Sequence, residues 1–142
     1  MSKAINEFSE FVLFSEDEHS ALDSRIETRQ ARGKKTTYVD CLVRNKAVQL
    51  KTEERTRQLW LAPLINQYGY PPSRIQVEYP ITFGRDSSKR ADIVVFDSDR
   101  PTVPYIIIEV KAAKLRDGKE QLRSYTHATG APLAVWSNGI LA

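Results

Sequence analysis

The chain has 142 residues, of which 41% are hydrophobic and 27% charged, values that exclude a disordered or fibrous protein and fit one soluble globular domain. Its single cysteine, Cys41, excludes an internal disulfide and a cysteine-rich zinc site. The sequence contains neither a secretory leader nor an apolar run near the roughly 18 residues of a membrane span, so we expect a cytoplasmic protein without membrane contact.

The net charge of +3 is unevenly distributed along the chain. Residues 1–24 contain one basic and six acidic residues, whereas residues 25–37 contain five basic residues and one acidic residue. We therefore predict a variable N-terminal arm over residues 1–37 and a folded domain over residues 38–142. The acidic part would dock on the body or form a short helix, and the basic part would be a loop or linker. Such a basic segment suits a polyanionic partner, although a solvated linker explains the same charge.

The first predicted elements of the domain are a hairpin and a helix. Residues 38–50 form two β-prone runs on either side of a turn-like Asn45 and Lys46. Thr52 is a candidate N-cap, and Gly69 is a natural stop for the helix between them. Five residues supply its apolar face: Leu59, Trp60, Leu64, Ile65 and Tyr68.

Two similar apolar runs, residues 91–96 and 105–110, dominate the second half of the chain. Nearly continuous apolar β-formers are typical of central strands that are buried on both faces of an α/β sheet. Residues 75–83 predict a further strand, bent or near an edge because it contains Pro80, and residues 84–90 predict a turn.

A second helix is predicted at residues 119–128 and a last strand at residues 132–136. The order after the hairpin is therefore α, β, β, β, α, β. This order predicts an α/β fold in which helices flank a mixed central sheet.

Acidic residues interrupt both apolar runs. Asp92 opens the first run, and Glu109 is next to last in the second. A carboxylate in a buried strand is costly unless a cation or several donors satisfy it. Two such acids on neighbouring strands predict a site for a hard divalent cation, which prefers oxygen ligands.

Lys111 follows Glu109 by two residues, so both side chains share one face of the strand while Val110 points into the core. A lysine beside a metal-bound phosphate can orient a water and offset developing charge. The alternative is a simple Glu–Lys ion pair at a strand end. On the following helix, Gln121 and Tyr125 share a face, and the alternative for them is a surface glutamine and a half-buried tyrosine.

These motifs carry a family resemblance. Asp92 with the E-x-K of residues 109–111 resembles the core motif of the PD-(D/E)XK nuclease superfamily, with Ala91 in place of its proline. The Q-x-x-x-Y of residues 121–125 resembles the extra motif of the branch that pairs nucleases with helicase motors. From about residue 38 to residue 139, five separated motifs resemble, in order, the N-terminal nuclease domain of type I restriction-enzyme R subunits.

The resemblance implies a restriction-endonuclease-like αβββαβ core that hydrolyses phosphodiester bonds of duplex DNA with Mg²⁺, for which Mn²⁺ can substitute. It implies four metal ligands: Asp92, Glu109, the backbone carbonyl of Val110, and Glu53. Glu54 competes for the last role, but the spacing from Glu53 to Arg57 favours Glu53. It also implies catalytic roles for Lys111, Gln121 and Tyr125. Arg90 resembles a basic residue of the family at this place, and the alternative for Arg90 is a plain surface arginine.

The implied partners are DNA, methylation and specificity subunits of a restriction-modification complex, and an ATP-driven translocase in the same longer chain. No phosphate-binding G-x-x-x-x-G-K-[ST] motif occurs in these residues, so an ATP site is not expected here. The alternative function is a catalytically inactive module that keeps the nuclease fold for DNA binding or for interaction.

Overall fold

The computed structural model of the chain describes residues 13–83, 85–112 and 118–139. Residues 1–12 of the predicted N-terminal arm lie outside these residues. No described helix is long and apolar enough to cross a membrane.

The central feature is a four-stranded mixed sheet in the order β4-β5-β6-β7. Strands β4 (Ile75–Phe83), β5 (Asp86–Phe96) and β6 (Pro104–Val110) are antiparallel neighbours, and β7 (Leu133–Ser137) pairs with β6 in parallel. The two apolar runs are therefore adjacent central strands, as predicted. Helices α3 (Thr52–Asn66) and α4 (Lys119–Thr129) complete the predicted αβββαβ order.

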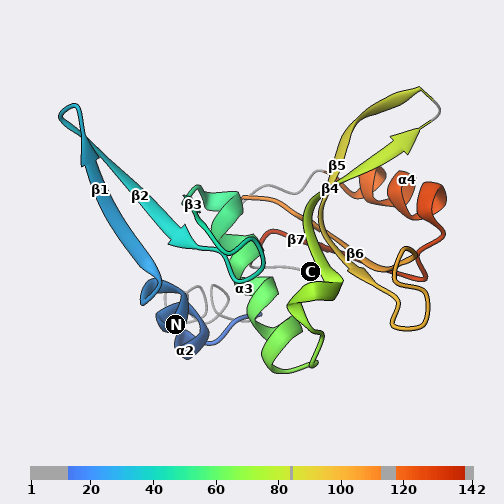
Figure 1. Cartoon of the computed structure of the whole chain (residues 1–142), viewed down its shortest axis with the longest axis horizontal. Coiled ribbons are helices and arrows are strands. Elements are labelled where there is room, and N and C mark those ends of the chain that lie inside the picture. Colours follow the sequence, from blue (N-terminus) through green and yellow to red (C-terminus); the bar gives the residue numbers. More distant parts are fainter. Residues whose placement is uncertain (1–12, 84, 113–117, 140–142) are drawn as a thin grey trace, which may run out of the picture.

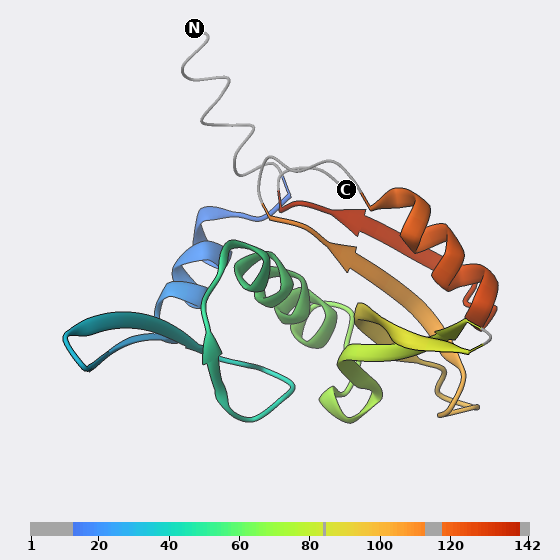
Figure 2. The same ribbon diagram turned by 90° about the horizontal axis from the view of Figure 1, so that it is seen from above.

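The two helices cover opposite faces of this sheet (Figure 2). Along β5, Ile93 and Val95 pack in the cluster that contains Leu61 of α3. Val94 faces the other way and packs in the cluster that contains Leu122 of α4. This alternation is the period of two that a strand imposes on its side chains, and it explains why the run is apolar at every position.

A second, three-stranded sheet contains β1 (Ile26–Ala31), β2 (Lys34–Asp40) and β3 (Ala47–Gln49). The predicted hairpin at residues 38–50 is confirmed, because β2 and β3 pair in antiparallel fashion. The prediction of a loop or linker at residues 25–37 is wrong, because β1 and β2 form a second hairpin. Arg32 and Gly33 both have positive φ, the conformation of a two-residue turn that matches the twist of paired strands.

The β1–β2 hairpin projects from the body of the molecule (Figure 1), and the boundary expected at residue 37 falls inside β2. The acidic stretch before it contains the predicted short helix, α2 (Glu16–Asp23), which begins with a capping box between Ser15 and Glu18. Phe14 packs edge-on against the ring of Trp60, with ring centroids 5.5 Å apart, so this segment docks on α3.

Three local predictions are wrong. Thr52 is the first residue of α3 rather than its N-cap, because the extended backbone before the helix belongs to Lys51. Tyr68 lies beyond the helix end and is 63% exposed. The turn predicted at residues 84–90 is mostly strand, since β5 begins at Asp86.

A short 3₁₀ helix, η1 (Pro72–Arg74), leads into β4.

Candidate active site

Asp92 and Glu109 lie at the same end of the two central strands. Ile93 of β5 pairs with Ile108 of β6 in antiparallel register, so the residue before Ile93 and the residue after Ile108 are neighbours across the ladder. Asp92 is 7% exposed and Glu109 is 3% exposed. The fold thus places two carboxyl groups side by side where little water reaches them.

Each oxygen of Asp92 accepts a hydrogen bond from the protein. The Nη2 of Arg57 donates to Oδ1 at 3.0 Å, and the backbone N–H of Val110 donates to Oδ2 at 2.9 Å. Asp92 is therefore fixed between the first helix of the core and the end of β6, in a position set by α3 as well as by its own strand.

Glu109 is the less satisfied of the two acids. Its Oε1 lies 4.0 Å from the Nζ of Lys111, and its buried Oε2 receives no hydrogen bond from any residue in the described ranges. Burial raises the pKa of the Glu109 carboxyl to about 9, the adjacent Asp92 adds to this rise, and Lys111 opposes it. With a proton on Glu109 the two carboxyls can share a hydrogen bond, and without one they repel each other.

The neighbouring acids of α3 have different surroundings. Glu54 is saturated, because it accepts hydrogen bonds from Arg44 at 2.7 Å, Arg57 at 2.6 Å and Gln58 at 3.0 Å. Glu53 is half-buried. Its burial raises the pKa of its carboxyl, and the nearby Asp92 raises it further. Of the two, only Glu53 is left to join the Asp92–Glu109 pair.

These acids suit a divalent cation. A buried carboxylate oxygen without a donor, beside a second carboxylate, is an arrangement that a bound cation relieves. No group of three His, Cys, Asp or Glu side chains within the described parts of the chain is already gathered for metal binding. Asp92 and Glu109 are the two buried carboxyl groups here that could hold such an ion, with the half-buried Glu53 near Asp92.

Gln121 and Tyr125 meet each other, and Tyr125 also contacts β5. The Gln121 amide donates to the Tyr125 hydroxyl, which donates at 3.1 Å to the backbone carbonyl of Arg90. Tyr125 is fully buried rather than half-buried. The Arg90 side chain is exposed and donates to the backbone carbonyl of Glu78 at 3.3 Å. The pair therefore holds β5 two residues before Asp92.

Sequence reasoning missed two further residues of the site. The spacing from Glu53 to Arg57 does not predict the buried ion pair that Arg57 forms with Asp92. Gly118 lies so close to Lys111 that a Cβ on the glycine would stand 2.6 Å from the lysine Cε. Gly118 thus leaves room for the Lys111 side chain, a proximity that sequence spacing does not reveal.

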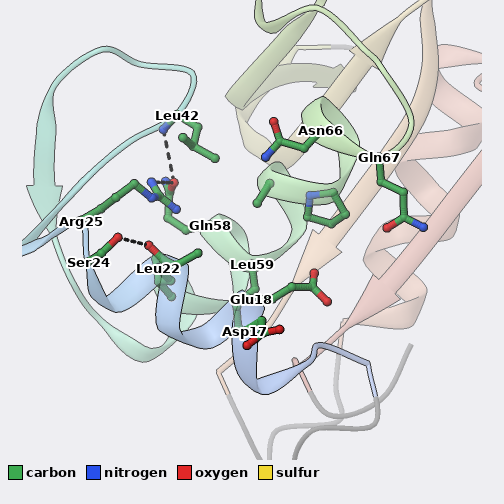
Figure 3. A pocket seen from close by; sticks show the side chains of 13 residues that line it. Asp17, Glu18, Leu22, Ser24, Arg25, Leu42, Gln58, Leu59, Asn66 and Gln67 are labelled. Atoms are coloured by element: carbon green, nitrogen blue, oxygen red, sulfur yellow. Dashed lines mark hydrogen bonds between the residues drawn. The ribbon is translucent and has the colours of Figure 1, made fainter.

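One cavity lies away from these residues. It has a volume of about 720 Å³, runs between α2 and α3, and contains none of the predicted site residues (Figure 3). A smaller cavity of about 300 Å³ is lined by Glu53 and Arg57, together with Lys51 and Glu78. This cavity reaches Glu53 and Arg57, and neither Asp92 nor Glu109 is among the residues that line it.

The αβββαβ core, with its mixed sheet and paired acids at the end of two central strands, defines a nuclease-like α/β domain. The family model for the type I restriction enzyme R protein N terminus (HSDR_N) matches residues 52–142, and the chain belongs to this family. The match begins at the start of α3, later than the residue 38 expected from sequence motifs. A comparison with curated proteins gave no match.

The raised pKa of Glu109 gives a pH prediction for the metal-free protein. The folded state keeps a proton on Glu109 between the ordinary carboxyl value of 4.5 and about 9, whereas the unfolded state has lost it. The free energy of unfolding should therefore fall as the pH rises through this window. Glu109→Gln, which mimics the protonated acid, should flatten the decline and raise the melting temperature at about pH 8.

Thermal melts with a chelator at a series of pH values measure this effect. Glu120→Gln, a change at an exposed position of α4, serves as the matched control and should melt like the wild type at each pH. Parallel pH profiles for Glu109→Gln and the wild type would contradict the assignment.

Proposed function

We propose that this domain is a Mg²⁺-dependent endonuclease that hydrolyses phosphodiester bonds of duplex DNA, as the DNA-cleaving part of a type I R subunit. The observation that carries the proposal is the buried Glu109, which has an unsatisfied oxygen beside Asp92 and a lysine two residues away. Membership of the type I R protein N-terminal family supports a role in restriction.

Asp92, Glu109 and the backbone carbonyl of Val110 would hold the metal, with Glu53 acting through water. Mg²⁺, or Mn²⁺ in its place, would polarise the scissile phosphate and lower the pKa of a bound water. Glu109 would lose its proton when the ion binds, since a carboxylate ligand must be ionised. The protein fixes this ligand pair through the hydrogen bond from the Val110 N–H to Asp92.

Lys111 would position the attacking water or a phosphate oxygen and offset the charge that develops on the phosphate. Its side chain is 20% exposed and passes along Gly118. Gln121 and Tyr125 would act indirectly, by positioning Asp92, because their hydrogen bonds fix the backbone of β5 next to it. In the complete assembly we expect DNA, methylation and specificity subunits, and a translocase on the same longer chain, as partners.

One observation favours the second candidate function, an inactive nuclease-fold module that binds DNA or another protein. Arg57 already neutralises Asp92, and both oxygens of Asp92 have donors without any metal. In a nuclease fold that has lost its activity, we would expect a buried carboxylate to be held by protein donors in this way. The two candidates differ in whether the domain cleaves DNA.

The test is cleavage of supercoiled plasmid with Mg²⁺, Mn²⁺ or a chelator. Asp92→Asn is compared with Asp99→Asn, the same change at an exposed position of the β5–β6 loop. We expect metal-dependent nicking by the wild type and by Asp99→Asn, and none by Asp92→Asn. If the isolated domain is inert, the assay is repeated with the translocase and partner subunits, and inactivity there would favour the inactive module.

Gly118 gives a further prediction, because it limits where Lys111 can lie. Gly118→Ala would force the lysine stem to move, and we expect cleavage to fall by about 10-fold at nearly unchanged DNA affinity. Gly130→Ala is a matched control, since Gly130 also has a positive φ at an end of α4 but has no atom within 4 Å of an added Cβ. Equal losses in both variants would mean that only backbone strain matters.

A further inference from the structure

We infer that the β1–β2 hairpin is a DNA-binding arm that acts with the β4–β5 hairpin to hold a duplex over the candidate site by its phosphates. This inference rests on the proposed function and names the surface that would bring DNA to it. The arm comprises residues 26–40 and lies outside the matched residues 52–142.

The arm is solvated and basic at its tip. Five of the six residues of β1 are exposed, so this strand contributes almost nothing to a core. Arg32, Lys34 and Lys35 surround the turn, all three are exposed, and none has an acidic partner within the described residues. Only the root of the hairpin packs on the body, through Ile26 and Val39. Its polar outer part gains little from burial, so that part needs a reason other than packing.

The root of the arm is tied to the candidate site by consecutive hydrogen bonds. Arg25, just before β1, donates at 3.1 Å to the Oε1 of Gln58, whose amide donates at 3.0 Å to Glu54. Glu54 accepts from Arg57, which also donates to Asp92. Arg25 also donates to the backbone carbonyl of Asp40 at the end of β2. The arm is thus held at a fixed place relative to the acids rather than tethered by a linker.

The β4–β5 hairpin carries a second basic group on the other side. Arg85 and Lys89 lie beside its turn and are exposed, and Arg90 follows them. The two hairpins project on opposite sides of the start of α3, where Glu53 lies (Figures 1 and 2). The carboxylates at the site would repel a phosphate chain, so cations on both sides are needed to bring it close.

Charge complementarity selects a polyanion, and paired flanking arms suit the two phosphate strands of a duplex. Such contacts place the backbone without reading bases, so the arm should bind DNA with little sequence preference. We therefore assign the arm to double-stranded DNA, and its salt dependence should report the number of phosphates that it neutralises.

The test is equilibrium binding of the whole chain to a duplex of about 30 base pairs over a range of salt concentrations, with a chelator to prevent cleavage. Lys34→Gln/Lys35→Gln should weaken binding by about 10-fold and reduce the salt slope by about 0.9 for each phosphate that the arm no longer neutralises. Lys34→Arg/Lys35→Arg, which keeps the charge, should bind like the wild type. Arg100→Gln removes an exposed charge from the β5–β6 loop and should leave the slope unchanged.

The outcomes separate this inference from the proposed function. Arm-dependent binding by a wild type that does not cleave even with the translocase and partner subunits supports the arm and contradicts the nuclease proposal. Cleavage by a wild type whose binding is the same with and without Lys34 and Lys35 overturns the arm and leaves the nuclease proposal standing. Equally tight, equally arm-dependent binding of duplex RNA would overturn the assignment to DNA.

Discussion

Replacement of Arg57 by methionine should destabilise the folded domain by about 3–5 kcal/mol, the range for a buried ion pair that loses one partner. Arg57 is 5% exposed and bridges two acids, Glu54 and Asp92, that are buried as well. Methionine fills a similar volume but removes the guanidinium that donates to Asp92 Oδ1. The cost comes from an uncompensated buried carboxylate rather than from a cavity.

Denaturant unfolding with a chelator present measures this loss. Arg55→Met is the matched control, because Arg55 pairs with Asp23 in a partly exposed position on the same helix, and its loss should cost less than about 1 kcal/mol. Mn²⁺ should restore part of the stability of Arg57→Met, since a bound cation would neutralise Asp92 in place of the guanidinium. An Arg57→Met protein as stable as Arg55→Met would show that Asp92 does not depend on the arginine.

The second large effect concerns Lys111. Both Lys111→Ala and Lys111→Arg should lower the cleavage rate by at least roughly 100-fold, near the scale of losing one well-placed stabilising donor. Arginine keeps the charge, but its planar fork is bulkier than a compact ammonium. The lysine stem already lies close against Gly118, and its Nζ lies 4.0 Å from Glu109, so the site leaves little room for a larger head.

Cleavage rate and DNA affinity are measured side by side at fixed salt. Affinity should change far less than rate, because one phosphate contact is a small part of a multi-contact electrostatic interaction. Lys119→Arg is the control, since Lys119 is exposed on α4 and its Nζ lies over the Trp136 ring. A Lys111→Arg protein that cleaves like the wild type would remove Lys111 from the catalytic role.

The fold was predictable wherever burial leaves a periodic pattern. The apolar runs at residues 91–96 and 105–110 identified the central strands because both faces of those strands are covered. The β1–β2 hairpin was missed because its exposed strands need no apolar alternation, and Arg32 and Gly33 are a weak turn signal. Elements without a buried face leave little trace in a sequence.

The candidate site divides in the same way. Asp92 and Glu109 stood out because charges inside apolar strands are costly. Lys111 stood out because it follows Glu109 by two residues and so shares its face of the strand. The environments of Glu53 and Glu54 could not be separated, because both acids equally suit the start of a helix. Only the fold shows that Arg44 and Gln58 donate hydrogen bonds to the Glu54 carboxylate and that Gly118 lies next to the Lys111 side chain.

The hydrogen bonds around Glu54 and Gln58 also bear on where the chain can be cut. A fragment limited to the matched residues 52–142 would lack Arg44, the main outside partner of Glu54, and Arg25, which binds Gln58. Two buried polar side chains would lose partners, and Leu59 would be uncovered where Val39 now packs on it. The smallest fragment expected to fold and stay soluble is therefore longer than the segment that the family model matches.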